Sequence, residues 1–252
     1  MSSKFSQQFL TAFRRWWKEQ ASEKGVSAAG SLLARELWDF LRDSTPARRR
    51  QRYGDMEYDW EHRVNTTSGT VGWRERLLGV FHSAYQPTDP AMFREMMTEL
   101  PIQFDQFSFV DLGSGKGRTL LLASEYPFQR IVGLEILPAL HREAEENIRA
   151  YRDSTGRGGQ IESVLADAGE YVFPETPLVV YLFNPLPEAG LRRVIGRLEE
   201  SLLKVWRPVW IVYHNPVLEH VVSASQMLER VSRAGHHSVY RTRAEKVCAP
   251  AC

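Results

Sequence analysis

The sequence is poor in cysteine. Its two cysteines, Cys248 and Cys252, form a C-x3-C pair at one end of the chain, with no histidine beside them. Such a pair makes a poor zinc site and no disulfide framework. We interpret both as incidental thiols of a reducing compartment. The sequence therefore predicts a cytoplasmic protein without a metal site.

Long apolar runs and a strong net charge are also missing. No stretch of 18 uncharged apolar residues occurs, so no transmembrane helix is predicted. The N-terminal stretch carries Arg14 and Arg15 and no apolar core, so no secretory signal peptide is predicted. The formal net charge of +1 gives no general field for nucleic acid. Stable nucleic-acid binding is therefore not expected.

The first hundred residues differ in pattern from the rest. Aromatic residues between Phe5 and Trp17 fall on one helical face, and leucines between Leu32 and Leu41 form a second such stripe. Residues 21–30 are the predicted connector, with Gly25 as the breaker. The aromatic stripe would permit contact with a membrane surface. Packing on the domain itself, or on a second copy as a homodimer, is favoured.

From Phe107 onward, apolar strands alternate with amphipathic helices. Continuous apolar runs such as "LVVYLF" suit strands buried on both faces, which is typical of a parallel sheet covered by helices. We predict an α/β, doubly wound, mostly parallel Rossmann-like domain over 101–252, preceded by a helical region and lid over 1–100. The predicted strands are 107–113, 130–136, 161–168, 178–185, 208–216 and an extended tail from 237. The predicted helices are 74–82, 90–100, 118–126, 138–152, 187–206 and 217–233.

The turn after the first strand, "DLGSGKGRT", has glycines at every second position. A P-loop needs G-x4-G-K-[ST], and this stretch fails on spacing because Gly117 follows Lys116. A dinucleotide fingerprint needs G-x-G-x-x-G, and Arg118 stands where its third glycine belongs. The pattern D-x-G-x-G-x-G is matched in full, from Asp111 to Gly117.

With these residues, the segment from about 107 to 216 resembles the class I, Rossmann-like S-adenosylmethionine-dependent methyltransferases. The resemblance covers a little under half of the chain, and the glycine turn is its most specific part. In that family, the acidic residue and the turn hold the methionine part of the cofactor. Carried over, these residues are Asp111, Gly113, Ser114, Gly115 and Gly117.

The chemistry of the turn agrees with this cofactor. S-adenosylmethionine has no phosphate, and its amino-acid end carries an ammonium that a carboxylate such as Asp111 attracts. Glycines allow a close backbone approach, and the following helix offers free N–H groups to the ligand carboxylate. Lys116 is then expected to face solvent at the start of that helix.

Acidic residues also follow the next two strands. Glu135 can accept both ribose hydroxyls, as in dinucleotide-binding folds, and Ile136 can pack on the adenine. The resemblance implies that Asp167 bonds the adenine amino group and that the neighbouring Ala168 contributes a backbone N–H.

The fourth strand ends in "YLFNPLP", which faces the reacting methyl in the resembling family. Members that methylate amino nitrogens carry N-P-P-[YFW], in which the asparagine side chain and a proline carbonyl accept bonds from the target nitrogen. Asn184 and Pro185 match its start, whereas Leu186 and Pro187 depart from it. The missing aromatic argues against a nucleobase acceptor. Tyr181 can supply an aromatic wall.

The fifth strand ends in "VYHNP". Its His214 is a candidate general base, and a satisfied buried histidine is the alternative.

Two segments of the first hundred residues are suited to covering the bound cofactor. They are residues 65–73 and 85–93. Within the second, Tyr85 and Thr88 are expected to line the methionine end. Segments like these precede the glycine turn in the non-SET lysine methyltransferases, which this stretch weakly resembles. That resemblance favours protein lysine or a small amine as the acceptor.

The sequence therefore predicts methyl transfer from S-adenosylmethionine to a nucleophile by in-line displacement. An amine nitrogen is the favoured acceptor; a hydroxylated metabolite or a nucleic acid is the alternative. An NAD-type oxidoreductase and a non-catalytic cofactor-binding module stay open as other classes. The identity of the acceptor does not follow from the sequence.

Overall fold

The structure is a computed structural model. It describes residues 14, 17, 18, 21, 22, 25–28, 30, 31, 34, 56–67, 87–184 and 186–244. The chain divides into two compact units, one of Met1–Glu61 with Thr67–Gln86 and one of His62–Thr66 with Pro87–Cys252. The second unit contains the sheet and all predicted site residues that the structure describes.

The second unit is built on a seven-stranded sheet with the order β3-β2-β1-β4-β5-β7-β6. Strands β1 to β5 pair parallel with one another, and β7 pairs antiparallel with both β5 and β6. The strands are β1 Ser108–Leu112, β2 Arg130–Glu135, β3 Ile161–Leu165, β4 Leu178–Leu182, β5 Val209–His214, β6 Leu228–Arg233 and β7 His237–Thr242. The strand order reverses between β1 and β4, which is the switch point where such sheets bind ligands. The predicted Rossmann-like fold is confirmed.

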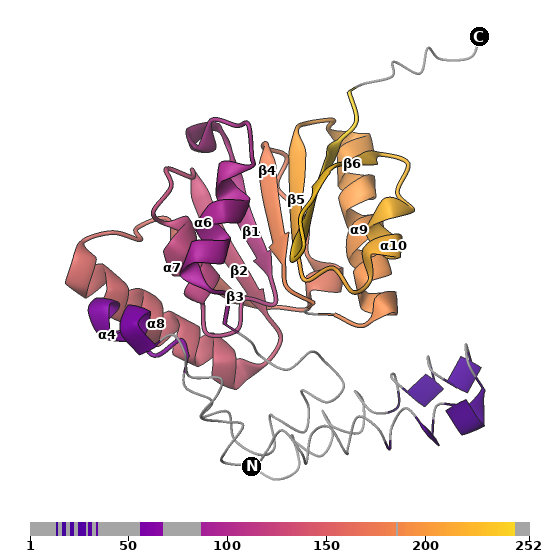
Figure 1. Cartoon of the computed structure of the whole chain (residues 1–252), viewed down its shortest axis with the longest axis horizontal. Coiled ribbons are helices and arrows are strands. Elements are labelled where there is room, and N and C mark those ends of the chain that lie inside the picture. Colours follow the sequence, from indigo (N-terminus) through magenta and orange to yellow (C-terminus); the bar gives the residue numbers. More distant parts are fainter. Residues whose placement is uncertain are drawn as a thin grey trace. The chain divides into compact units, whose positions relative to one another are not determined.

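Helices flank the strands on both sides, as Figure 1 shows. We call the side on which α6, α7 and α8 pack the α7 face, and the side covered by α9 and α10 the α9 face. The helices of this unit are α6 Pro90–Thr98, α7 Arg118–Ala123, α8 Pro138–Thr155, α9 Glu188–Lys204 and α10 Glu219–Ser223, with 3-10 turns η1 Phe104–Gln106 and η2 Ala168–Glu170.

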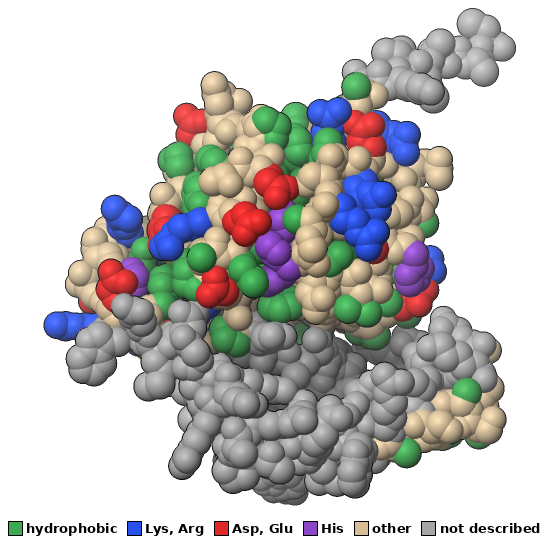
Figure 2. All heavy atoms as spheres, viewed as in Figure 1, with side chains coloured by type: hydrophobic (Ala, Val, Ile, Leu, Met, Phe, Trp, Pro, Cys, Tyr) green, Lys and Arg blue, Asp and Glu red, His purple; other side chains and the backbone are tan. Residues whose placement is uncertain are grey.

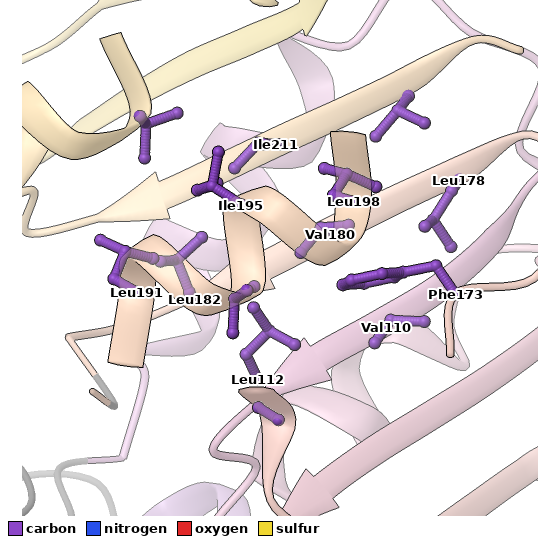
Figure 3. Packing of buried hydrophobic residues seen from close by; sticks show 14 of the residues in the cluster. Val110, Leu112, Phe173, Leu178, Val180, Leu182, Leu191, Ile195, Leu198 and Ile211 are labelled. Carbon is purple, nitrogen blue, oxygen red and sulfur yellow. The ribbon is translucent and has the colours of Figure 1, made fainter. Parts of the chain in front are cut away.

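The α9 face carries an apolar core (Figure 3). Alternate residues of the strands, such as Val110 and Val180, point into it, because successive strand residues face opposite sides. Helix α9 adds Leu191, Ile195 and Leu198, whose spacing places them on one stripe of the helix. Strands β1, β4 and β5 are buried along their whole length, which explains their unbroken apolar sequences.

The α7 face is aromatic near the amino ends of the strands. Phe109 of β1 contacts Phe93 of α6 edge-on, with ring centroids 6.0 Å apart, and Phe128 at 5.3 Å. Towards the carboxyl ends, this face becomes polar. The candidate site begins there.

The prediction of a helix over 217–233 is wrong for most of its length. Only Glu219–Ser223 is helical, and Leu228–Arg233 forms β6. This strand pairs with β7 from Leu228 opposite Thr242 to Arg233 opposite Ser238. The backbone bonds to β7, which follows β6 after residues 234–236 and forms a hairpin with it, outweigh the helical spacing of the short apolar run.

The first unit is described in part. Its residues on both sides of Gly25 are helical, and Gly25 has a left-handed φ of 84°, which glycine adopts without steric cost. Helix reaches further into the predicted connector than expected, since residues 21, 22, 26–28 and 30 are helical. Helix α4 spans Met56–His62.

Several predictions fall outside the described residues. They concern the helix 74–82, most of both apolar stripes, Tyr85, Pro185 and the two cysteines. Among the helices that the structure does describe, none is long and apolar enough to cross a membrane.

Candidate functional site

The glycine turn connects β1 to α7 and is folded in a way that requires glycine. Gly113, Gly115 and Gly117 have φ values of 78°, 55° and 83°, a region that side chains with a Cβ rarely adopt. The N–H groups of Gly113 and Ser114 donate to the carbonyl of Leu134 at 2.9 and 3.0 Å. The turn is therefore tied to the end of β2.

Gly133 in β2 also serves the turn, and the sequence analysis missed it. A Cβ on Gly133 would lie 2.5 Å from Ser114 Oγ and 2.6 Å from Leu120 Cδ1. The strand must lack a side chain here so that the turn can pack against it. A glycine inside an apolar strand is the signal that could have identified it.

Asp111 is buried near the carboxyl end of β1, at 3% exposure. Its Oδ2 accepts a hydrogen bond from the Thr119 hydroxyl of α7. Burial raises the pKa of Asp111 from 3.8 to about 7, against the Thr119 bond, with the nearby Glu135 charge adding to the increase. A carboxylate held this way has much to gain from a cation beside it.

Glu135 ends β2 and is buried at 5% exposure. Its two oxygens accept from the N–H of Gly115 at 2.9 Å and from the N–H of Leu137 at 2.8 Å. Burial raises the pKa of this carboxyl, while the backbone bonds act in the opposite direction. Glu135 thus spans the end of β2 and the middle of the glycine turn.

The predicted adenine residues lie at the ends of β2 and β3. Ile136 is 40% exposed and Leu165, which pairs with Glu135 across the sheet, is 49% exposed. Asp167 accepts from the N–H of Gly169 at 2.9 Å and caps η2, with Ala168 buried beside it. Exposed apolar side chains next to a buried carboxylate offer a surface that a flat apolar ring can cover.

Three buried groups form a hydrogen-bonded chain on the α7 face. The Tyr181 hydroxyl lies 2.8 Å from Thr88 Oγ1 and 2.8 Å from His214 Nδ1. Burial raises the pKa of Tyr181 well above 10 and lowers that of His214 to about 4, with His236 and His237 adding to the latter shift. At neutral pH, therefore, Tyr181 is protonated and His214 is neutral.

Two further histidines lie beside this chain, and the His236 ring centroid is 6.0 Å from that of His214. His237 stands opposite His214 in the β5–β7 pairing, is fully buried, and lies 2.9 Å from Glu99 of α6. Figure 2 shows histidine and acidic side chains together on the surface between α6 and β6. Within the described residues, no group of His, Cys, Asp and Glu side chains is arranged to hold a metal ion.

Asn184 follows β4 and is fixed at both ends of its amide. Its Oδ1 accepts from the Tyr213 hydroxyl at 2.8 Å, and its Nδ2 donates to the Asn215 carbonyl at 2.5 Å. Asn184 and Asn215 both have left-handed φ values, 45° and 50°, and such backbone strain gathers at functional sites. The Tyr213 hydroxyl in turn accepts from the N–H of Leu218 at 3.1 Å.

Lys116 does not face solvent, so that prediction is wrong. Its side chain is fully buried, and Nζ lies 2.6 Å from Glu143 Oε2 of α8. Glu143 could not be recognised as the partner from the sequence, because 27 positions along the chain separate the two residues. The Lys116 amine is thus paired with a carboxylate on α8.

Comparisons with known proteins found similar solved structures. No protein-family model and no curated protein matches the sequence. Among solved structures, it is similar to an RNA methyltransferase from Salinibacter ruber in complex with S-adenosyl-L-homocysteine, with 26% identity, 62% of this chain and 92% of that chain covered, and a TM-score of 0.44. A precorrin-6y C5,15-methyltransferase from Geobacter metallireducens is 17% identical over 61% and 87% of the two chains, with a TM-score of 0.46.

A third similar structure is an S-adenosylmethionine-dependent O-methyltransferase from Thermotoga maritima. It is 14% identical over 65% of this chain and 69% of that one, with a TM-score of 0.46. All three structures are of proteins described as methyltransferases.

Proposed function

We propose that this protein transfers a methyl group from S-adenosylmethionine to an amine nitrogen. The observation that carries the proposal is the pair of buried carboxylates, Asp111 and Glu135, set around a glycine turn at the switch point of the sheet. Two buried carboxylates disfavour a phosphate ligand by charge repulsion and favour a ligand with a cationic end.

The residues present fit this cofactor. Asp111 would hold the ammonium of the methionine end, with Gly113, Ser114, Gly115 and Gly117 shaping the turn around it. Thr88 acts indirectly, because its hydroxyl is bonded to Tyr181.

The nucleoside end of the cofactor would lie over the ends of β2 and β3. Glu135 would accept the ribose hydroxyls, and the exposed side chains of Ile136 and Leu165 would pack on the adenine. Asp167 and Ala168 stand beside that surface.

Bound S-adenosylmethionine supplies a methyl group on a cationic sulfur, and the leaving group is a neutral thioether that needs no acid. The bond formed joins the acceptor nitrogen to the methyl carbon, and the bond broken is the one between that carbon and sulfur. The main task of the protein is then to position the acceptor nitrogen and to let its proton depart.

Asn184 is the residue we assign to the acceptor. An amide oxygen can accept two hydrogen bonds, and Tyr213 uses one of them on Oδ1. The other lone pair can accept an N–H from the acceptor, while the bond from Nδ2 to Asn215 keeps the amide from rotating. An acceptor that donates an N–H fits this arrangement; Pro185, whose carbonyl was predicted to help, lies outside the described residues.

His214 is the group that could take up the proton of an ammonium acceptor, since Tyr181 keeps its own proton at neutral pH. His214 is neutral at pH 7 because its pKa is about 4, so it has a nitrogen lone pair available. A base this weak releases the proton to water at once. Its second role is to hold the Tyr181 hydroxyl in place.

Calorimetric titration with S-adenosylmethionine and, separately, with NAD tests the cofactor. We expect binding of the first and none of the second; the reverse would identify an oxidoreductase site. Glu135→Ala should weaken S-adenosylmethionine binding by about 1–3 kcal/mol, because it removes the partner of the ribose hydroxyls. Glu146→Ala, on the exposed surface of α8, is the matched control and should leave the affinity unchanged.

Transfer of a tritiated methyl group to fractionated cell extract tests the acceptor. We expect label in the protein or small-amine fraction. Label in nucleic acid or in hydroxylated metabolites would refute the amine assignment while keeping the methyl transfer. Binding without any transfer would instead support a non-catalytic cofactor-binding module.

A further inference from the structure

The short segment His62–Thr66, which we call the strap, belongs to the same compact unit as the sheet although it lies far before β1 in sequence. It follows α4, and Arg63 has a left-handed φ of 55°. Several side chains from α7 and α8 hold the strap, and none of these contacts follows from the sequence pattern.

Asn147 of α8 makes the central contact. It is buried at 5% exposure, and its Oδ1 accepts from the N–H of Asn65 at 2.7 Å while its Nδ2 donates to the carbonyl of Asn65 at 3.1 Å. The side-chain amide therefore pairs with the strap backbone as a neighbouring strand would. The same Nδ2 group donates to the carbonyl of Lys116 at 3.0 Å, so one amide joins the strap to the glycine turn.

Arg118 makes a second connection between the strap and the turn. It is 1% exposed, and its Nε donates to the Thr66 hydroxyl at 2.7 Å. Arg118 is the first residue of α7, directly after Gly117. Two residues of the "GKGR" stretch are thus linked to the strap, Lys116 indirectly through Asn147 and Arg118 directly through its guanidinium.

Further along α8, the same side of the helix continues to hold the strap. His62 stacks on Tyr151 with ring centroids 5.5 Å apart, and the Ser154 hydroxyl donates to the His62 carbonyl at 3.2 Å. Positions 143, 147, 151 and 154 follow the spacing of one helical stripe. Glu143, at the head of this stripe, holds Lys116.

We propose that Asn147 is a positioning residue of the cofactor site: it fixes the Lys116 peptide of the glycine turn and docks the strap on it, so that strap docking and cofactor binding are coupled. The proposal rests on the proposed function. To bind a ligand, the turn must hold three glycines with left-handed φ values in place. The buried side-chain amide of Asn147 restrains the central peptide of this turn. Coupling between two sites is reciprocal. A contact that stabilises the docked strap must therefore favour the turn conformation that binds ligand, and a bound ligand must favour the docked strap.

Amide hydrogen exchange and calorimetry on the full chain test this, with S-adenosylhomocysteine and S-adenosylmethionine as the probes. In the wild-type protein, we expect either ligand to slow exchange in residues 62–66 as well as in the glycine turn. Asn147→Ala should speed exchange of the strap without ligand and raise the Kd by about 5- to 10-fold. Arg149→Ala, exposed on the same helix, should change neither quantity.

Thr66→Val covers the case in which Asn147→Ala does not fold. It removes the hydroxyl that Arg118 contacts and leaves the turn and α8 untouched. We expect faster exchange of the strap and a weaker ligand affinity, each to a smaller extent than for Asn147→Ala. A folded variant with wild-type strap exchange, or with a loosened strap and an unchanged Kd, would overturn the coupling.

Failure of the cofactor assignment looks different. In that case the wild-type protein binds neither ligand, and the proposed coupling fails as well. Hydrogen exchange of the strap, measured without ligand in the wild type and in Asn147→Ala, still reports whether Asn147 docks the strap.

Discussion

The two faces of the sheet are built from alternate residues of the same strands, yet they differ in chemistry. On the α9 face, Val110, Leu112 and Val180 meet aliphatic residues of α9 in an apolar cluster. On the α7 face, their neighbours Asp111 and Tyr181 are buried but make hydrogen bonds. Because the strands are shared, the apolar face can fix the position of the polar one. Stability and ligand binding should therefore respond separately to changes on the two faces.

The largest effect is expected from the apolar face. Leu198→Ala should lower the free energy of unfolding by about 2–5 kcal/mol, because it leaves a cavity where a side chain of 1% exposure is now packed. Affinity for S-adenosylmethionine, measured below the unfolding transition, should stay at the wild-type value. Denaturant unfolding and calorimetry measure the two quantities. A large loss of affinity in the folded variant would show that the faces are not separable.

The next effect concerns Asp111 and depends on pH. Its pKa of about 7 in the folded protein lies above its ordinary value of 3.8. Between these values the folded state keeps a proton that the unfolded state has lost, so the contribution of Asp111 to stability falls as pH rises from about 4 to 7. Asp111→Asn should remove this fall, which urea unfolding at a series of pH values measures.

The same group makes cofactor binding pH-dependent. A cationic ligand favours the ionised carboxylate, so binding below pH 7 should release a proton, and affinity should rise with pH up to about 7. Calorimetry in two buffers of different ionisation enthalpy measures the proton release. Asp111→Asn should abolish it and weaken binding by about 1–3 kcal/mol. If the variant released the same number of protons on binding as the wild type, a group other than Asp111 would be responsible for the pH dependence.

The smallest effect is expected for Tyr213, which connects the apolar α9 face to the candidate site. Tyr213 lies in the apolar cluster, but its hydroxyl bonds Asn184. Tyr213→Phe should cost about 1–2 kcal/mol of stability, since both hydrogen bonds of the hydroxyl are lost while the ring remains. It should slow methyl transfer without changing S-adenosylmethionine affinity. A weaker cofactor affinity would contradict the assignment of Asn184 to the acceptor side.

Much of the fold could be predicted from the sequence because its signals are local. The glycine turn, the apolar strands and the helix begun by Pro138 each follow from a few neighbouring residues. The strand β6 could not be predicted in this way, since it depends on pairing with β7 rather than on its own spacing. Its residues include Val231 and Arg233, which are both solvent-exposed.

The residues of the candidate site divide in the same way, into those with a local sequence signal and those without one. Asp111 and Glu135 could be predicted from their places at strand ends. Thr119 and Asn147 could not, because each acts on a residue that only folding brings near. The burial of Lys116 was missed for the same reason: its partner is on α8. Residues at strand ends and in the glycine turn follow a motif, whereas residues that hold the motif in shape leave a much fainter signal.

The bond between Glu135 and the Gly115 N–H has a consequence for binding itself. The Glu135 carboxylate restrains the turn through this bond, so a ligand that drew Glu135 away would exchange hydrogen bonds instead of only adding new ones. The affinity then reports the difference between two satisfied states. The binding enthalpy should be modest for the number of polar contacts formed. Ligands too short to replace the displaced hydrogen bond should bind weakly, and this difference should provide much of the selectivity.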